Sequence, residues 1–104
     1  MIRYRFYVGT TNAEGPVSHA ECEAYLVKLY GGYSASDVRG AWCAGDGHVV
    51  VEASVVYEVL TEEVSGTSIA RAMDDALTLC QLAQQESVLW TCERVYGGFA
   101  SAQS

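Results

Sequence analysis

Basic residues are scarce in this 104-residue chain: six lysines and arginines stand against thirteen aspartates and glutamates, and the net charge is −7. Proteins that bind nucleic acids or anionic membranes through their charge need a basic patch. The composition therefore argues against both kinds of partner. It fits a soluble protein, and it leaves open an acidic protein that mimics nucleic acid.

Long apolar runs are absent as well. No stretch reaches the roughly 18 apolar residues of a membrane-spanning helix, and the opening MIRYRFYVGT has no apolar core of a secretion signal. Half of the residues are hydrophobic, which is ordinary for a globular protein, and the length fits one domain. We therefore expect a single domain over residues 1–96, a flexible tail over 97–104 and a cytoplasmic location.

Motifs for metal binding and for catalysis are also missing. The cysteines form no C-x-x-C pair and have no histidine at a ligand spacing, and there is no Ser/His/Asp order, paired-carboxylate motif or P-loop. We expect no metal and no cofactor. We also expect four reduced thiols among apolar neighbours, with two disulfides or a nucleophile as alternatives. The cysteines are Cys22, Cys43, Cys80 and Cys92.

The strongest local signal that is present predicts a β-hairpin over residues 38–61. Asp46-Gly47 lies between two apolar runs, and such a pair favours a tight turn because both central positions need positive φ. The second run is rich in valine, as strands are. Glu52 is the one charged residue between Val49 and Tyr57.

Periodicity assigns the other elements. Alternating apolar residues predict strands over residues 2–9 and 87–96, and helical spacing predicts helices over residues 18–30 and 67–84. The resulting order, β-α-β-β-α-β, predicts an α+β fold of the ferredoxin-like type. It consists of a four-stranded antiparallel sheet, in strand order 4-1-3-2, with two helices on one face.

The other sheet face is then left uncovered by helices. Alternation places Arg5 and Tyr7 of the first strand on this open face, and the hairpin adds Trp42 and Glu52. A monomer seldom leaves such a mixture of apolar groups and charges in water. We therefore expect a homodimer or a higher homo-oligomer, in which two-fold packing of open faces sets arginine against glutamate.

The predicted ligand site combines the open face with the loop after the first strand. Its residues are Arg5, Tyr7, Thr10, Thr11, Asn12, Trp42 and Glu52. The arginine would hold an anionic group, the two aromatic rings would stack on a base, and the loop precedes a helix N-terminus that can bind phosphate. The glutamate is either a ligand anchor or general base, or the structural ion-pair partner of the arginine on the adjacent strand.

Four other polar residues give no functional signal. A capping box over residues 18–21 predicts the start of the first helix, and His19 within it has no evident partner. His48 directly follows the hairpin turn, where an exposed histidine is more often idle than catalytic. Asp74 and Asp75 lie off the apolar stripe of the second helix, so we expect both in solvent.

Several short motifs resemble a family of small uncharacterised bacterial and phage proteins. The motifs are Gly40-x-Trp42, Asp46-Gly47, Glu52-x-Ser54 and Gln85-x-Ser87-Val88-Leu89. The compact, acidic, glycine-rich chain is also similar to small phage accessory proteins, some of which bind host proteins or sequester nucleotide immune signals. The resemblance implies a phage-encoded binding protein that captures a nucleotide-like small molecule in an oligomeric assembly. Two alternatives are an inhibitor of a host protein and a small enzyme like the dimeric α+β barrel proteins.

Overall fold

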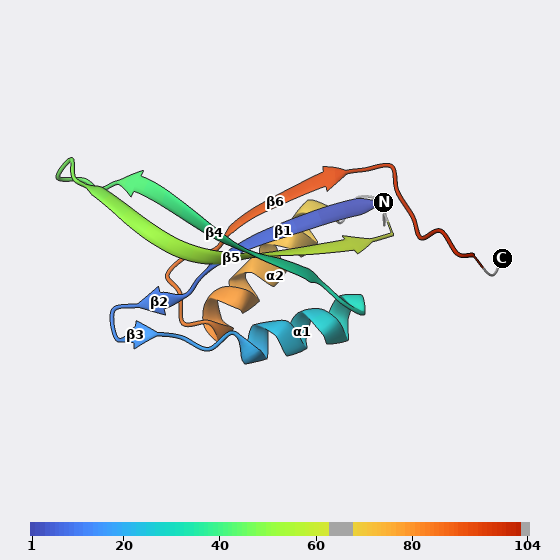
Figure 1. Cartoon of the computed structure of the whole chain (residues 1–104), viewed down its shortest axis with the longest axis horizontal. Coiled ribbons are helices and arrows are strands. Elements are labelled where there is room, and N and C mark those ends of the chain that lie inside the picture. Colours follow the sequence, from blue (N-terminus) through green and yellow to red (C-terminus); the bar gives the residue numbers. More distant parts are fainter. Residues whose placement is uncertain (63–67, 103–104) are drawn as a thin grey trace.

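The computed structural model of the chain describes residues 1–62 and 68–102. Its elements are β1 (Ile2–Gly9), β2 (Thr11–Asn12), β3 (Gly15–Pro16), α1 (Ala20–Tyr30), β4 (Ser34–Cys43), β5 (Val49–Thr61), α2 (Ser68–Leu82) and β6 (Leu89–Arg94). The four long strands form one antiparallel sheet in the order β4-β5-β1-β6, and both helices lie on one side of it (Figure 1). The predicted α+β fold and its strand order are confirmed.

The core lies between this sheet and the two helices. Every second residue of β1 is buried against the helices, as the alternation predicts. Tyr57 and Val59 continue the buried face on β5, and α1 and α2 contribute Leu26 and Leu79, neither of which is exposed to solvent. Each fully buried leucine side chain stabilises the fold by about 1.5–3 kcal/mol.

Asp75 of α2 is buried, although its position predicts a side chain in solvent. Tyr25 donates a hydrogen bond to Asp75 Oδ1 at 2.7 Å, and Tyr30 donates one to Oδ2. Burial and the contact with Asp75 raise the pKa of both tyrosines. The prediction was wrong because the two hydroxyls belong to α1, and no spacing within α2 reveals them. Hydrogen bonds to Asp75 therefore link α2 to α1.

His19 is the N-cap residue of α1 and joins this helix to the sheet. Its Nε2 lies 2.7 Å from the carbonyl oxygen of Gly9, and its Nδ1 lies 2.8 Å from the hydroxyl of Tyr57. Tyr57 donates in turn to Glu23 at 2.9 Å. The sequence predicts no partner for His19, and the structure provides two. The predicted capping box does not form, because the Ser18 hydroxyl accepts from the N–H two residues on instead.

The strands β4 and β5 extend past the end of β1 as a two-stranded arm, defined here as residues 38–53. β1 ends at Gly9 opposite Ser54, so among the described strands the earlier residues of β5 pair with β4 alone. The arm projects from the body along the 55 Å length of the molecule (Figure 1). Alternation with Glu52 places Val49 and Val51 on the helix-facing side of β5. They are nevertheless 65% and 63% exposed, because none of the described helices reaches them.

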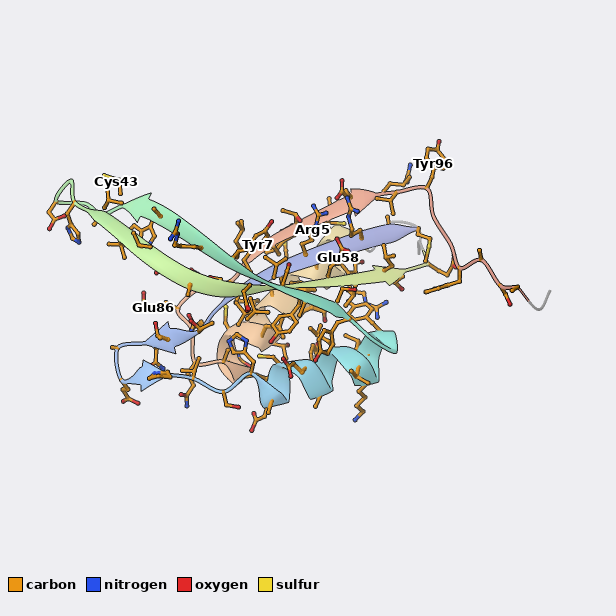
Figure 2. The ribbon with its side chains drawn as sticks, viewed as in Figure 1. Arg5, Tyr7, Cys43, Glu58, Glu86 and Tyr96 are labelled. Carbon is orange, nitrogen blue, oxygen red and sulfur yellow. The ribbon has the colours of Figure 1, made fainter. Side chains whose placement is uncertain are left out.

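All four cysteines are free. Cys22 is buried in the core, and Cys80 and Cys92 are partly buried. Cys43 is exposed near the tip of the arm, where Figure 2 labels it. The expected apolar surroundings are therefore wrong for Cys43, because the alternation that places it on the helix-facing side continues beyond the helices.

We expect one thiol, Cys43, to react quickly with a disulfide reagent under native conditions. Burial raises the pKa of Cys22 to about 11 and also raises the pKa of Cys80 and of Cys92. The thiolate is the attacking form, so these three groups should react slowly. A native titration should release about one equivalent quickly, and Cys43→Ser should abolish this phase. Two or fewer free thiols in denaturant would contradict the structure.

Two further expectations concern the tail and the membrane. The described residues after β6, 95–102, contain no helix or strand, and Phe99 is 94% exposed. The domain end at residue 96 remains a prediction. None of the described helices combines the length and the apolar character that crossing a membrane requires.

Candidate functional site

A cleft of about 950 Å³ lies where the arm, the β2–β3 ribbon and the turn after α2 meet. The ribbon lines it with residues 11–14, the turn with residues 84–87, and the arm with Trp42 and Glu52. Figure 2 shows Glu86 beside the ribbon and below the arm. Three segments that are distant in sequence therefore build one concave surface.

Four of the seven predicted site residues line this cleft. They are Thr11, Asn12, Trp42 and Glu52. A fifth, Thr10, lies next to the cleft and fixes the ribbon to the arm. Its N–H and its hydroxyl both donate to the carbonyl oxygen of Ala53 at 3.1 Å. The loop after the first strand and the hairpin thus come together as the predicted site combined them, but Arg5 and Tyr7 do not line the cleft.

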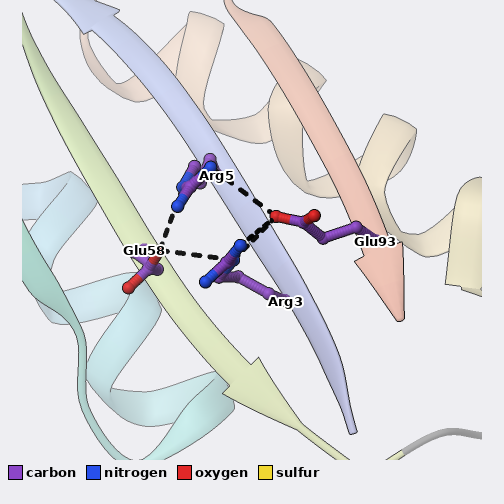
Figure 3. Close-up of polar contacts among 4 residues, drawn as sticks. All are labelled: Arg3, Arg5, Glu58 and Glu93. Carbon is purple, nitrogen blue, oxygen red and sulfur yellow. Dashed lines mark hydrogen bonds and ion pairs between the residues drawn. The ribbon is translucent and has the colours of Figure 1, made fainter. Parts of the chain in front are cut away.

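Arg5 belongs instead to an ion-pair cluster on the open sheet face (Figure 3). Arg5 Nε donates to Glu58 Oε1 at 2.9 Å, and Arg3 Nε donates to Glu93 Oε1 at 2.8 Å. Arg3 also lies 3.5 Å from Glu58, and Arg5 lies 3.6 Å from Glu93. The hydrogen bond from Arg3 lowers the pKa of Glu93. The four charges satisfy one another within the chain.

The predicted pairing of Arg5 with Glu52 is therefore wrong. Glu52 stands opposite Gly40 in the arm, beyond the end of β1, whereas Arg5 stands opposite Glu58. The alternation correctly identified the face of each residue, but it could not give the register. Tyr7, the remaining predicted site residue, stands opposite Val56 on the sheet and does not line the cleft.

Two side-chain amides hold the ribbon against the turn after α2. Gln85 Nε2 donates to the carbonyl oxygen of Thr11 at 3.0 Å, and Asn12 Nδ2 donates to that of Gln84 at 3.3 Å. Gly9 permits this approach, because a Cβ there would lie 2.3 Å from Gln85 Oε1. The Gln-x-Ser-Val-Leu motif therefore begins with a residue that shapes the cleft.

Substituting Gly9 by alanine should disturb the cleft. The added Cβ displaces Gln85 and breaks its bond to Thr11, which should lower the free energy of unfolding by about 1–2 kcal/mol. Thermal unfolding of Gly9→Ala measures this loss. Gly45→Ala is the matched control, because a Cβ at Gly45 meets no atom within 4 Å and should change little. Equal stability of the two variants would refute this role of Gly9.

The lining of the cleft is acidic. Glu14, Glu52 and Glu86 are among its described lining residues, and these include no arginine or lysine. Carboxylates repel phosphate groups and attract cations, so the cleft lacks the anion-binding character that Arg5 was expected to supply. Trp42 is 52% exposed, so its indole can stack on a flat or cationic group.

The lining residues that the sequence did not identify are chiefly Glu14, Gln84, Gln85 and Glu86. They stand in a short ribbon and in a turn, and only the tertiary fold brings these two segments together. Gln85 carried a signal as the first residue of the Gln-x-Ser-Val-Leu motif, whose Ser87 also lines the cleft. Within the described residues, no three His, Cys, Asp or Glu side chains gather closely enough to hold a metal ion.

Comparison with known proteins finds no matching family model and no matching curated protein. Solved structures that share the fold include two of a phage SAM lyase. One is a phage SAM lyase in complex with S-methyl-5'-thioadenosine, with a TM-score of 0.66 and 22% identity over 88% of this chain and 79% of that chain. The other is a phage SAM lyase in its apo state, with a TM-score of 0.66 and 21% identity over 88% and 78% of the two chains. At these identities, the likeness establishes that this chain has the same fold as those lyases.

Proposed function

We propose that this chain is a phage-encoded binding protein whose cleft captures an adenosine derivative. The observation that carries the proposal is the cleft itself, which combines the exposed Trp42 indole with three carboxylates. An indole can stack on an adenine ring, and a carboxylate can accept hydrogen bonds from the hydroxyls of a ribose. The fold shared with a lyase that holds S-methyl-5'-thioadenosine supports the same ligand class.

The negative charge of the cleft restricts which adenosine derivatives can bind. With Glu14, Glu52 and Glu86 in the lining, a phosphorylated nucleotide is repelled and a neutral or cationic nucleoside is favoured. S-adenosylmethionine carries a sulfonium cation and S-methyl-5'-thioadenosine carries none, so both satisfy this condition. The proposal therefore departs from the nucleotide immune signals that the sequence suggested, while it keeps capture of a small nucleoside.

Capture gives the protein its role. A stoichiometric binder in the host cytoplasm lowers the free concentration of its ligand, which is the action expected of an anti-defence protein. We infer that it does so as a homo-oligomer. The reason no longer lies in the ion pairs of the open face, because those charges are paired within the chain. It lies in the apolar residues that the arm exposes, among them Val49 and Val51.

Cleavage of the ligand is a second candidate function. The observation that favours it is the fold likeness to two SAM lyase structures. Capture and cleavage use the same cleft, so they differ in what becomes of the ligand. Recovery of unchanged S-adenosylmethionine after incubation indicates capture, whereas its conversion to S-methyl-5'-thioadenosine indicates cleavage.

Thermal unfolding with added ligands tests the proposal. At a ligand concentration of about 100 Kd, binding adds about 2.7 kcal/mol, which for a domain of this size raises Tm by about 10 °C. We expect a rise with S-adenosylmethionine and with S-methyl-5'-thioadenosine, but none with AMP. Trp42→Ala should remove most of the rise, and mass spectrometry of the ligand then separates capture from cleavage. No rise with either nucleoside, or a larger one with AMP, would overturn the proposal.

A further inference from the structure

The strand β4 forms an edge of the sheet, and no other described strand pairs with its outer side. All but one of its ten residues are exposed, and it contains no proline. Long, exposed edge strands are templates for pairing with another strand, and proteins usually blunt them. In addition, the arm that β4 forms with β5 is two-stranded, and an isolated two-stranded hairpin is marginally stable in water. A third strand on this edge would stabilise it.

The hydrogen-bond pattern identifies the residues that face this edge. Ala44 N–H donates to the His48 carbonyl oxygen at 2.8 Å, so this pair bonds across the hairpin. Because antiparallel ladders alternate, the even-numbered residues of β4 bond to β5 and the odd-numbered ones direct N–H and C=O outward. The Thr10 N–H bond to Ala53, on the other side of β5, obeys the same alternation. The outward residues within the strand are Ala35, Asp37, Arg39, Ala41 and Cys43.

The charges on this edge are self-complementary. Asp37 and Arg39 are two residues apart on β4, so their side chains lie on the same face of the sheet. We propose that β4 pairs antiparallel with β4 of a second copy of this chain, about a two-fold axis through Val38. Asp37 then stands opposite the partner's Arg39, and the symmetry repeats the ion pair. The outward groups from residue 35 to residue 41 make roughly eight backbone hydrogen bonds across the contact.

The same charges exclude the neighbouring registers. A shift that pairs Arg39 with the partner's Arg39, or Asp37 with the partner's Asp37, sets like charges directly opposite each other, which is destabilising. A slip by one residue brings even-numbered residues against odd-numbered ones, and the outward hydrogen-bonding groups then fail to meet. The register about Val38 is therefore the one in which both the backbone and the charges are satisfied.

This pairing also supports the cleft. In this register Trp42 stands opposite the partner's Ser34. The partner's strand therefore supports the part of the arm that carries Trp42 and lines the cleft. The inference specifies the assembly named in the proposed function, but it does not depend on any ligand. A measurement of the oligomer mass therefore tests the dimer, and a ligand titration separately tests the proposed function.

Charge reversal of the ligand-free chain tests the proposal. Sedimentation velocity should give twice the 11.2 kDa mass of one chain. In either single variant, Asp37→Arg or Arg39→Asp, the two-fold symmetry places two pairs of like charges opposite each other. Each variant should therefore weaken the dimer at least tenfold. The combined variant restores both ion pairs and should restore the dimer. A monomeric natural chain, single variants that stay dimeric, or a combined variant that stays monomeric would each overturn the proposal.

Cysteine cross-linking tests the register independently. On the two-fold axis, Val38 faces its own copy in a pair without hydrogen bonds, where the Cα atoms lie about 4.5 Å apart and a disulfide can form. In a Cys43→Ser background, Val38→Cys should form a disulfide-linked dimer on mild oxidation. Ser36→Cys is the control, since it faces the partner's Gly40 and should not cross-link. Circular dichroism verifies that both variants are folded, and equal or reversed cross-linking of the two would refute this register.

Discussion

Replacing Tyr25 and Tyr30 together by phenylalanine is expected to lower the free energy of unfolding by about 3 kcal/mol. The shape of the helix interface is preserved, but the buried Asp75 carboxylate loses both hydroxyl donors. Domains of this size have only about 5–15 kcal/mol in total, so the loss is large. Thermal unfolding should show Tm lower by about 10 °C or more.

A double-mutant comparison separates loss of the two hydrogen bonds from general damage to the interface. Asp75→Ala in the double-phenylalanine background removes the unsatisfied carboxylate, and it should restore part of the lost stability despite the smaller side chain. In the natural background, Asp75→Ala should destabilise, because it strands the two hydroxyls. If Asp75→Ala destabilises equally in both backgrounds, then the tyrosines do not hold this carboxylate.

The second large effect concerns the charge of the cleft. Glu52→Lys is expected to weaken binding of S-adenosylmethionine by about tenfold to a hundredfold, because it replaces an attraction by a repulsion of about 1–4 kcal/mol at close range. Binding of S-methyl-5'-thioadenosine, which lacks the cation, should change by less than about threefold. Isothermal titration calorimetry measures both affinities with the same protein.

Two matched variants complete this experiment. Glu52→Gln removes the charge with little change of shape and should give an intermediate loss for the cationic ligand. Glu62→Lys changes the net charge of the chain as Glu52→Lys does, but Glu62 is exposed and does not line the cleft. Its variant should bind both ligands normally. An equal loss for the two ligands in Glu52→Lys would mean that Glu52 acts through the shape of the cleft and not through its charge.

The fold could be predicted because its signals are local. The alternation along β1 and the turn at Asp46-Gly47 depend on neighbouring residues, and these fix the elements and the buried face of each strand. The partner of Arg5 was not predictable in this way. It depends on the register between β1, which has 8 residues, and β5, which has 13. No local sequence pattern indicates which residue of β5 lies opposite the end of β1.

The residues that line the cleft likewise fall into those with a local sequence signal and those placed only by the tertiary fold. Thr11, Asn12 and Trp42 were found because loop composition and an outward aromatic residue can be recognised in the sequence. Glu14 and Glu86 were missed because they enter the site through contacts between the ribbon and the turn after α2. Such contacts reverse the expected charge of the site, from an anion-binding face to an acidic cleft. Four of the residues predicted from the sequence therefore line this cleft, whereas Arg5, the only cation among the predicted residues, does not.

The continuity of β5 determines how the cleft can open and close. One unbroken strand carries Tyr57 in the core and Glu52 in the wall of the cleft. No loop interrupts it at Ser54, where β1 ends, so the arm has no hinge at its base. A ligand that drew the arm toward the ribbon would therefore have to bend β5 along its length, because the strand has no flexible joint there. Under the proposed function, closing the cleft on a ligand would strain β5, and release of this strain would favour reopening when the ligand leaves.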